Sequence, residues 1–600
     1  MEEAKRIRSR EEIPDEDKWA LEDLYATDTD WEEDLKTVAE DQEYLAGFAG
    51  KLNRPDVLYA YLQRSEALNV KADRLGNYCM RKADEDTRNG TYQAMQGKFM
   101  SVFVALGAAT SFDSPEIMAI SQEDMERFYR EYPALERYRR YLTNLRRRKD
   151  HTLSPAEEKI LAAAGEMADA PDNIYGAFAD ADISFPDAVD SQGNVHPLTQ
   201  GTFVHLEESP DRVLRQSAYE NLYNGFAGFK NTAAAILNAQ NKQLKFFADA
   251  RKYPSAFARS LDRTDVPTAV YHNLIEAVHN NLDKMHRYVR LRKKLLGLDQ
   301  LHFYDIYTPL VADVDRTIPY AEAKQTIYDA LHPLGEDYRA ILKEGFENRW
   351  IDVYQNQGKR SGAYSAGAAV HPYVLMNYTG TLDSQFTLAH EMGHAIHSYL
   401  SNKHQNPIDA DYVIFVAEVA STCNEALLME NLLEKTTNKK ERAYLINHFL
   451  DQFKGTIYRQ TMCAELELNI GKLVTEGQTL TADILCAEYK RLNELYYGSD
   501  MVVDDRIAME WARIPHFYYN YYVFQYATGY AAAIALSRRI LQEGEPAVRD
   551  YLNFLSGGCS RSPIDLLKVA GVDMASPEPV NQALELFGQL LDEMETLMEE

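Results

Sequence analysis

The 600-residue sequence lacks the features of several protein classes. It has no uninterrupted apolar run that approaches about 18 residues, the length needed for a membrane-spanning helix, so we expect no such helix. The first residues, Met1 to Lys5, begin a charged stretch without the apolar segment of a secretory signal. The five cysteines are odd in number, widely scattered and without a Cys-x-x-Cys pair. We therefore expect buried free thiols and a reducing compartment, with the cytoplasm as the default.

Positive charge is also scarce. The sequence has 64 Lys and Arg residues against 92 Asp and Glu residues, which gives a net charge of −28. This balance disfavours nucleic acid or an anionic membrane surface as a general partner. In the most basic stretch, residues 137–149, we expect a salt-bridged helix rather than a polyanion site. A chain of this length can bury a large core and form more than one structural unit.

Strand patterns are few, and helical patterns dominate the chain. Amphipathic runs predict helices near 31–48, 55–86 and 90–109. One pair of strands is expected at 183–185 and 203–206, around a turn at 191–194. A second pair, at 350–354 and 373–378, is expected to form a small sheet before the most informative motif of the chain. This sheet either supports the motif or offers an edge to an extended peptide.

That motif is His390-Glu391-Met392-Gly393-His394. On an α-helix the two histidines lie one turn apart on the same face, where both can ligate one zinc ion. Glu391 projects to the side, where it can act on a metal-activated water without ligating the metal. The surrounding residues are apolar on most faces, which predicts a buried helix. Burial of two imidazoles and a carboxylate is costly unless they are paired or bound to a metal.

A catalytic zinc ion usually has three protein ligands and one open position. The second predicted helix, 412–428, carries only two carboxylates, Glu418 and Glu425, two turns apart on one face. One of them can ligate the metal while the other accepts the N–H of a ligand histidine. The alternative is that both glutamates face solvent.

An aromatic run at 516–530 is the other unusual stretch. If it is helical, Tyr519, Tyr522, Tyr526 and Tyr530 form a stripe along one face. Such a stripe is ordinarily core packing. Amide hydrolysis, however, develops an oxyanion that a phenol or imidazole can stabilise, so His516 and the tyrosines are also candidate catalytic groups.

Together, the motif at 390–394, Glu418 and Glu425 resemble the M3 family of zinc metallopeptidases, in particular its oligoendopeptidase F branch. Further similarity lies at 19–25, 304–307, 359–364 and 514–519, in the same order, so the resemblance spans nearly the whole chain. It implies one zinc ion held by His390, His394 and Glu418, with Glu391 as general base.

The resemblance also implies roles for residues outside the ligand set. Glu425 is expected to support a ligand histidine, and His516, Tyr519 and Tyr526 are expected to act on the transition state. The first tyrosine follows the histidine more closely in this chain than in the thimet-like branch. Tyr518, Tyr519 and Tyr522 therefore stay alternatives for that position.

The expected fold is mainly α, with many helices in two lobes around a deep substrate channel and a small β-sheet next to the zinc helix. We expect an N-terminal helical domain (1–115), a helical and strand connecting region (116–205) and a catalytic zinc peptidase domain (206–600). The expected activity is hydrolysis of internal bonds in oligopeptides. Two alternatives are a peptide-binding protein without turnover and another zinc hydrolase, such as an amidase or aminopeptidase. The oligomeric state stays open.

Overall fold

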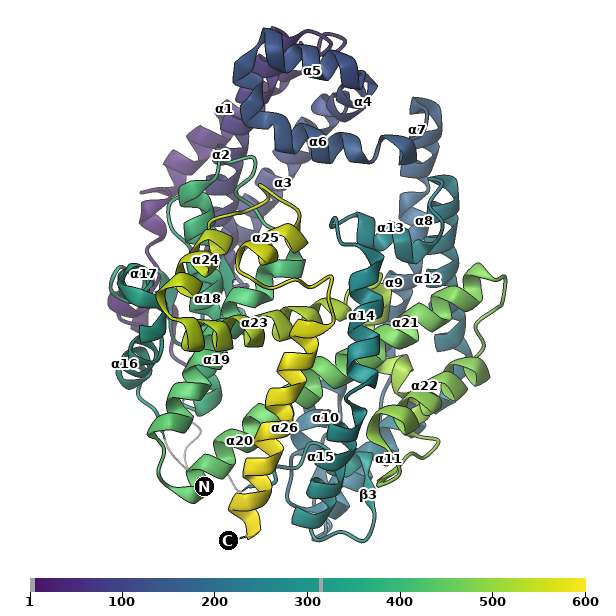
Figure 1. Ribbon diagram of the computed structural model, residues 1–600. Coiled ribbons are helices and arrows are strands. Elements are labelled where there is room, and N and C mark those ends of the chain that lie inside the picture. The colour runs from purple at the N-terminus through teal and green to yellow at the C-terminus, as the bar shows by residue number, and fades with distance from the viewer. Residues whose placement is uncertain (1–5, 312–316, 600) are drawn as a thin grey trace. The chain divides into compact units, whose positions relative to one another are not determined.

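The computed structural model describes residues 6–311 and 317–599, so the charged segment from Met1 to Lys5 lies outside the described residues. Helices dominate, and the few strands form small sheets (Figure 1), which confirms the mainly α class. The chain forms two compact units, each made of three separate stretches of sequence. The chain-order boundaries at 115 and 205, and the substrate channel, stay predictions.

The first unit comprises Met1–Thr152, Arg316–Leu428 and Leu536–Gly571. Its longer helices and its strands are α1 (Asp28–Ala46), α2 (Pro55–Glu85), α3 (Gly90–Thr110), α4 (Asp113–Ala119), α5 (Gln122–Glu131), α6 (Arg139–Arg147), α16 (Tyr320–Ala330), α17 (Gly335–Glu347), β4 (Ile351–Asp352), β5 (Tyr364–Ala366), β6 (Tyr373–Leu375), α18 (Leu382–His404), α24 (Glu545–Leu555) and α25 (Pro563–Val569). Short 3₁₀ turns connect several of them, among them η1 (Arg10–Glu12), η2 (Asp15–Asp17), η3 (Leu21–Asp23) and η4 (Pro133–Tyr138).

The second unit comprises Leu153–Asp315, Met429–Ala535 and Val572–Glu600. Its elements include α7 (Pro155–Ala163), α8 (Gly165–Ala168), α9 (Ala170–Gly176), β1 (Ala188–Val189), β2 (Val195–His196), α10 (Gln200–Glu207), α11 (Arg212–Gly228), α12 (Lys230–Ala250), α13 (Ala256–Asp262), α14 (Thr268–His279), α15 (Leu282–Leu295), β3 (Leu301–His302), α20 (Lys439–Phe453), η9 (Lys454–Tyr458), α21 (Arg459–Thr475), α22 (Ala482–Tyr497), β7 (Met501–Val502), η10 (Ile507–Arg513), η11 (Pro515–Tyr518) and α26 (Glu578–Glu599). Two helices, α19 (Ile414–Lys435) and α23 (Phe524–Glu543), begin in one unit and end in the other.

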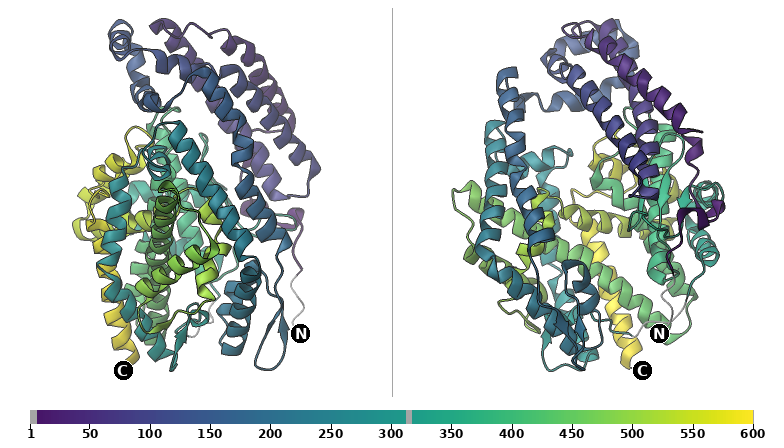
Figure 2. Two further views of the ribbon diagram at one scale, coloured as in Figure 1. Left: turned by 90° about the vertical axis from the view of Figure 1, so that its right-hand side faces the viewer. Right: turned by 180° about the vertical axis from the view of Figure 1, so that it is seen from behind.

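Three long helices near the N-terminus, α1, α2 and α3, pack together in the first unit (purple in Figure 2). Thr27 caps α1 and accepts a hydrogen bond from the backbone N–H of Asp30, and Trp31 is buried in the next turn. The same hydrophobic core continues to Tyr373 and Leu375 of β6. Burial of these apolar faces therefore joins the N-terminal helices to the sheet that precedes α18.

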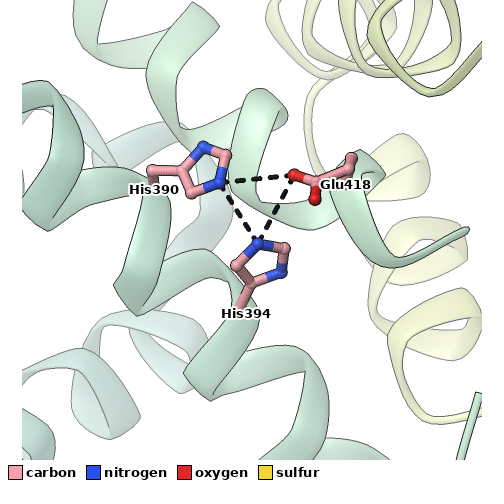
Figure 3. Close-up of side chains that lie close together, drawn as sticks. All are labelled: His390, His394 and Glu418. Carbon is pink, nitrogen blue, oxygen red and sulfur yellow. Dashed lines mark hydrogen bonds and ion pairs between the residues drawn. The ribbon is translucent and has the colours of Figure 1, made fainter. Parts of the chain in front are cut away.

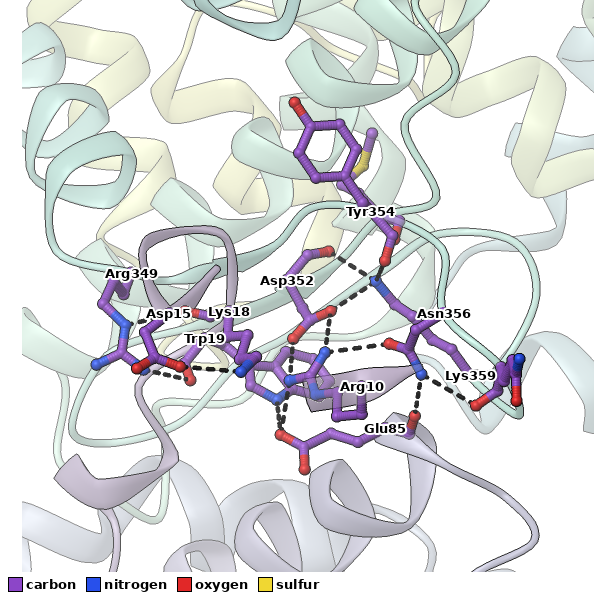
Figure 4. A network of polar contacts seen from close by, with 12 residues as sticks. Arg10, Asp15, Lys18, Trp19, Glu85, Arg349, Asp352, Tyr354, Asn356 and Lys359 are labelled. Carbon is purple, nitrogen blue, oxygen red and sulfur yellow. Dashed lines mark hydrogen bonds and ion pairs between the residues drawn. The ribbon is translucent and has the colours of Figure 1, made fainter. Parts of the chain in front are cut away.

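A buried ionic network fixes the N-terminal segment to this sheet (Figure 4). The Arg10 guanidinium donates to Asp352 of β4, with an N–O distance of 2.8 Å, and to Glu85 of α2 at 2.9 Å. The Lys359 ammonium lies 2.6 Å from the Asp352 carboxylate and also donates to the carbonyls of Tyr354 and Met376. Burial favours the neutral acid, but the two cations keep the pKa of Asp352 below its ordinary value.

The sheet beside α18 is three-stranded, in the order β4-β6-β5, and both β5 and β6 contact α18. The small sheet expected next to the zinc helix is therefore confirmed. β4 pairs with β6 in parallel register, whereas β5, which lies between the two expected strands in the sequence, pairs with β6 in antiparallel register. The strand expected at 203–206 is wrong, because these residues belong to α10; the turn at 191–194 instead joins β1 to β2.

The structure also bears on the membrane-spanning helices and the cysteines considered from the sequence. Among residues 6–311 and 317–599, no helix has both the length and the hydropathy needed to cross a bilayer. The five cysteines are free thiols, and Cys79, Cys423 and Cys463 are buried.

Candidate metal centre

The motif at 390–394 lies near the middle of α18, which begins at Leu382 after the N-cap residue Thr381. The Thr381 side chain accepts a hydrogen bond from the Ser384 N–H and so satisfies one of the first donors of the helix. Apolar residues of the motif helix, including Met392 and Ile396, are fully buried. The helix is therefore buried, as the apolar residues on most of its faces predict.

His390 and His394 of α18 face Glu418 of α19 (Figure 3). The Nε2 atoms of the two histidines are 3.2 Å apart. The Glu418 Oε2 atom is 3.3 Å from His390 Nε2 and 3.4 Å from His394 Nε2. Three ligand-type atoms from two helices therefore converge on one point.

These separations match the size of a zinc ion. Zinc–nitrogen and zinc–oxygen bonds are about 2.0–2.1 Å long, and tetrahedral geometry then separates neighbouring ligand atoms by about 3.3–3.4 Å. The measured distances between the three atoms are 3.2, 3.3 and 3.4 Å. A set of two imidazoles and one carboxylate also suits zinc chemically, so the residues present fit the metal.

Two further side chains contact two of the three convergent groups, His390 and Glu418. The Nδ1 atom of His390 hydrogen-bonds to the Glu425 carboxylate, which leaves Nε2 directed at Glu418. The Ser421 hydroxyl donates to a Glu418 carboxylate oxygen at 3.2 Å. Burial opposes charge on His390, but Glu418 and Glu425 raise the pKa of this imidazole well above its ordinary value. The sequence did not reveal the role of Ser421, although its position three residues after Glu418 places both on one helix face.

The close approach of α18 and α19 depends on Gly393. A Cβ atom built at this residue lies 2.6 Å from the Ser421 Cα and 2.7 Å from the Ala420 carbonyl oxygen. Nearby, the Asn424 side-chain amide donates to the Ala389 carbonyl at 3.0 Å and its oxygen accepts from the Tyr338 hydroxyl at 2.7 Å. The middle glycine of the motif therefore allows the helix contact that brings Glu418 to the histidines.

Glu391 is buried beside this cluster and is not one of the three convergent groups. Its Oε2 atom has no hydrogen-bond partner among the described residues. Burial raises the pKa of Glu391 above its ordinary value, while the charges of His390 and His394 oppose that shift. A buried carboxylate with one unpaired oxygen beside this cluster is suited to accept a proton.

His516, Tyr519, Tyr522 and Tyr526 form a second group in the other unit, which we call the ring cluster. The His516 ring centroid is 5.4 Å from that of Tyr519, 6.4 Å from that of Tyr522 and 6.2 Å from that of Tyr526. Burial, and to a lesser extent the charge of Arg459, lower the pKa of His516. Whether the ring cluster acts at the metal centre stays a prediction.

The helical stripe expected at 519–530 is wrong for its first two members. Helix α23 begins at Phe524, so Tyr519 and Tyr522 lie in the irregular segment before it. Tyr518 is buried and stacks on Tyr175, with ring centroids 4.3 Å apart, which indicates a packing role. The side chain of Tyr519 is half exposed. Of the three alternatives for the first tyrosine, the structure groups Tyr519 and Tyr522 with His516.

A buried helix that carries His-Glu-x-x-His, with a nearby glutamate completing a cluster of three residues that could hold a metal ion, is typical of the class of HExxH hydrolases. Comparison with known proteins narrows this class. Residues 205–586 match the profile of Peptidase family M3, and residues 116–185 match the profile described as Oligopeptidase F. The chain belongs to peptidase family M3.

Relatives and solved structures agree with this assignment. Oligopeptidase PepF of Bacillus subtilis is 44% identical over 99% of this chain and 89% of its own length. Group B oligopeptidase PepB of Streptococcus agalactiae is 39% identical over 98% of each chain. A putative peptidase from Chlamydophila abortus superposes with a TM-score of 0.93 at 35% identity, over 99% of this chain and all of the other. Oligoendopeptidase-F from Enterococcus faecium gives a TM-score of 0.75 at 35% identity, over 95% of this chain and 99% of its own.

Proposed function

We propose that the protein is a zinc-dependent endopeptidase that hydrolyses internal bonds of oligopeptides. His390, His394 and Glu418 hold one zinc ion per chain, Glu391 is the general base, and Glu425 orients His390. The observation that carries the proposal is the convergence of three ligand atoms at tetrahedral separations, with an unpartnered carboxylate beside them. The substrate class is supported by the names of the relatives, which are oligopeptidases and oligoendopeptidases.

Each residue has a defined task in the proposed reaction. When bound, zinc supplies a Lewis acid that makes a water molecule acidic near neutral pH and polarises the scissile carbonyl. Glu391 accepts a proton from the attacking water at a carboxylate oxygen and later delivers it to the nitrogen of the leaving amine. Glu425 accepts the Nδ1 proton of His390, which fixes the tautomer whose Nε2 lone pair faces Glu418.

We assign the ring cluster to the oxyanion that develops on the substrate. The donors proposed from the sequence are the His516 ring and the hydroxyls of Tyr519 and Tyr526. Tyr522 is added to this group because its ring centroid lies 5.3 Å from that of Tyr526. Loss of one such donor typically lowers kcat by about 100-fold or more. Tyr522→Phe and Tyr519→Phe variants, compared at saturating substrate, identify the tyrosine that donates.

Glu391→Gln tests the assignment of the base. Glutamine has the shape of glutamate but cannot accept the proton, so kcat should fall by at least about 100-fold while the zinc content stays at one per chain. Metal analysis and peptide turnover are measured on the same preparation. Turnover near that of the unchanged protein would remove Glu391 from this role.

An internally quenched peptide blocked at both ends separates the proposed activity from its alternatives. Cleavage of the blocked peptide requires an endopeptidase, whereas an aminopeptidase needs a free amino terminus. Binding without cleavage by the zinc-loaded protein would favour the peptide-binding alternative. The cytoplasmic compartment and the absence of nucleic-acid or membrane partners stay predictions.

A further inference from the structure

The loop that carries most of the ring cluster has a strained backbone. This ring loop comprises residues 516–522. Within it Asn520 and Tyr521 have φ angles of +63° and +59°. Both are in the left-handed region, which asparagine adopts more readily than other residues with a side chain but which is unfavourable for a large aromatic one such as Tyr521. Two consecutive residues of this kind keep their conformation only when surrounding contacts enforce it.

Two buried polar side chains from neighbouring helices supply those contacts. The Gln240 side-chain amide of α12 donates to the Tyr518 carbonyl at 3.0 Å and to the Asn520 side-chain oxygen at 2.9 Å. Glu467 of α21 accepts the backbone N–H of Tyr521 at 2.9 Å. The ring loop is therefore held by hydrogen bonds at both strained residues and at the carbonyl that precedes Tyr519.

Packing fixes the same loop from another side. The Tyr521 ring is buried and lies 5.3 Å from the Phe257 ring and 6.2 Å from the Tyr271 ring, measured between centroids. Its hydroxyl fills the space beside Gly471 of α21, where any Cβ atom would collide with it. Tyr521 therefore points into the core while its neighbours Tyr519 and Tyr522 join the ring cluster.

The burial of these two polar side chains reduces the stability of the folded protein. Gln240 and Glu467 are only 3% and 5% exposed. One side-chain oxygen of each, Gln240 Oε1 and Glu467 Oε2, has no hydrogen-bond partner among the described residues. Buried polar groups without full hydrogen bonding reduce stability, and at these two sites only the contacts with the ring loop offset that cost. A positional role in the ring loop explains why polar groups occupy them.

We propose that Gln240 and Glu467 are positioning residues, which hold the ring loop in its left-handed turn and thereby place His516, Tyr519 and Tyr522 for the reaction. This inference rests on the proposed role of the ring cluster. Gln240 and Glu467 lie in α12 and α21, two helices that carry none of the candidate catalytic or metal-binding residues proposed from the sequence. The required geometry is narrow, because a misplacement of about 1 Å in a reacting group can lower the rate by about 100-fold.

Glu467→Leu and Glu467→Gln form a matched pair of tests. Leucine has a similar size but cannot accept the Tyr521 N–H, so kcat should fall about tenfold or more with KM within about twofold. Glutamine keeps an acceptor oxygen in place and should restore kcat. A purely structural role would lower the melting temperature, more in the leucine variant because it leaves the Tyr521 N–H unpaired, and would leave the kcat of the folded protein unchanged. Equal kcat in the two variants would overturn the inference.

Asn520→Gly and Asn520→Val give a second pair that leaves the core intact. Glycine adopts the left-handed conformation freely, whereas valine strongly disfavours it. We expect the valine variant to melt at a lower temperature than the glycine variant, because the native turn strains it, and to lose kcat about tenfold more when both proteins are assayed fully folded. If valine is tolerated as well as glycine, the turn is not required for activity.

A double-mutant cycle separates this inference from the proposed function. If Gln240 acts through the ring loop, Gln240→Leu should lower kcat in the unchanged protein but add little in a His516→Ala background. If His516→Ala and the Tyr519→Phe and Tyr522→Phe variants all retain full kcat, the proposed role of the ring cluster fails. If those variants lose kcat but Gln240→Leu does not, only the positioning role fails.

Discussion

Replacement of Gly393 by alanine should separate α18 from α19 and weaken the metal centre without changing any ligand. The added Cβ would lie 2.6 Å from the Ser421 Cα and 2.7 Å from the Ala420 carbonyl oxygen. Ordinary contact begins near 3.4 Å, and both neighbours are backbone atoms that cannot rotate away. The two helices must therefore part locally by about 0.8 Å.

That displacement is large compared with the tolerance of a metal site. Metal–ligand distances vary by only about 0.2 Å, whereas Glu418 moves with α19 and the two histidines stay on α18. The present separations of 3.3 and 3.4 Å between Glu418 and the histidines would then exceed what one zinc ion can bridge without strain. We expect the zinc affinity to fall about 10- to 100-fold, and overpacking to cost about 1–3 kcal/mol of stability.

Competition with a chelator measures the affinity, and thermal unfolding with and without zinc measures the stability. Gly97→Ala is the matched control, because Gly97 is an exposed residue within α3 and a Cβ there meets nothing within 4 Å. This control should leave zinc binding unchanged and stabilise the protein by about 0.5–1 kcal/mol. Unchanged zinc affinity and unchanged melting in Gly393→Ala would refute the argument that helix proximity sets the ligand geometry.

Single contacts elsewhere in the protein lead to three more expected outcomes. Glu425→Gln removes the carboxylate that accepts the Nδ1 proton of His390, and should weaken zinc about tenfold while one ion still binds at high concentration, as measured by chelator competition. Lys359→Met leaves the buried Asp352 carboxylate with one cation fewer, so the free energy of unfolding, measured with denaturant, should fall by about 3 kcal/mol. The double variant Lys359→Met with Asp352→Asn should recover part of this loss, because it removes the buried charge. Burial raises the pKa of Glu467 to about 8. Between about pH 4.5 and 8 the folded protein therefore keeps a proton on Glu467 that the unfolded chain has lost. The free energy of unfolding should fall across this window as pH rises, by up to about 5 kcal/mol. Glu467→Gln should flatten that slope, and an unchanged slope would show that the pH dependence has another origin.

The family could be predicted from a resemblance that spans nearly the whole chain, and the main helices could be predicted because their signals are local. The i, i+4 spacing places His390 and His394 on one face of any α-helix, whatever surrounds it. The amphipathic runs before residue 110 likewise predicted helices that the structure contains. Short strands were less predictable: β5 lies in a stretch rich in glycine and serine, and it exists because β6 pairs with it.

Which of Glu418 and Glu425 faces both histidines could not be predicted from the residue spacing. Both lie on one face of α19, and spacing alone leaves either as the third ligand. The contact of α18 with α19 at Gly393 favours Glu418 for that role, since Glu418 lies near both Nε2 atoms whereas Glu425 hydrogen-bonds to Nδ1 of His390. Distances between helices depend on packing, which no local pattern specifies.

The aromatic run gives the sharpest contrast. Its composition predicted donors for an oxyanion, but a regular helix was the natural expectation for its tyrosines. The left-handed turn at Asn520 and Tyr521 is instead enforced by Gln240 and Glu467, which lie far away in the sequence. The sequence by itself thus determined which chemical groups are present and which pairs share a helix face. Only the tertiary structure decided which glutamate joins the histidines and which tyrosines surround His516, because both depend on contacts between distant segments.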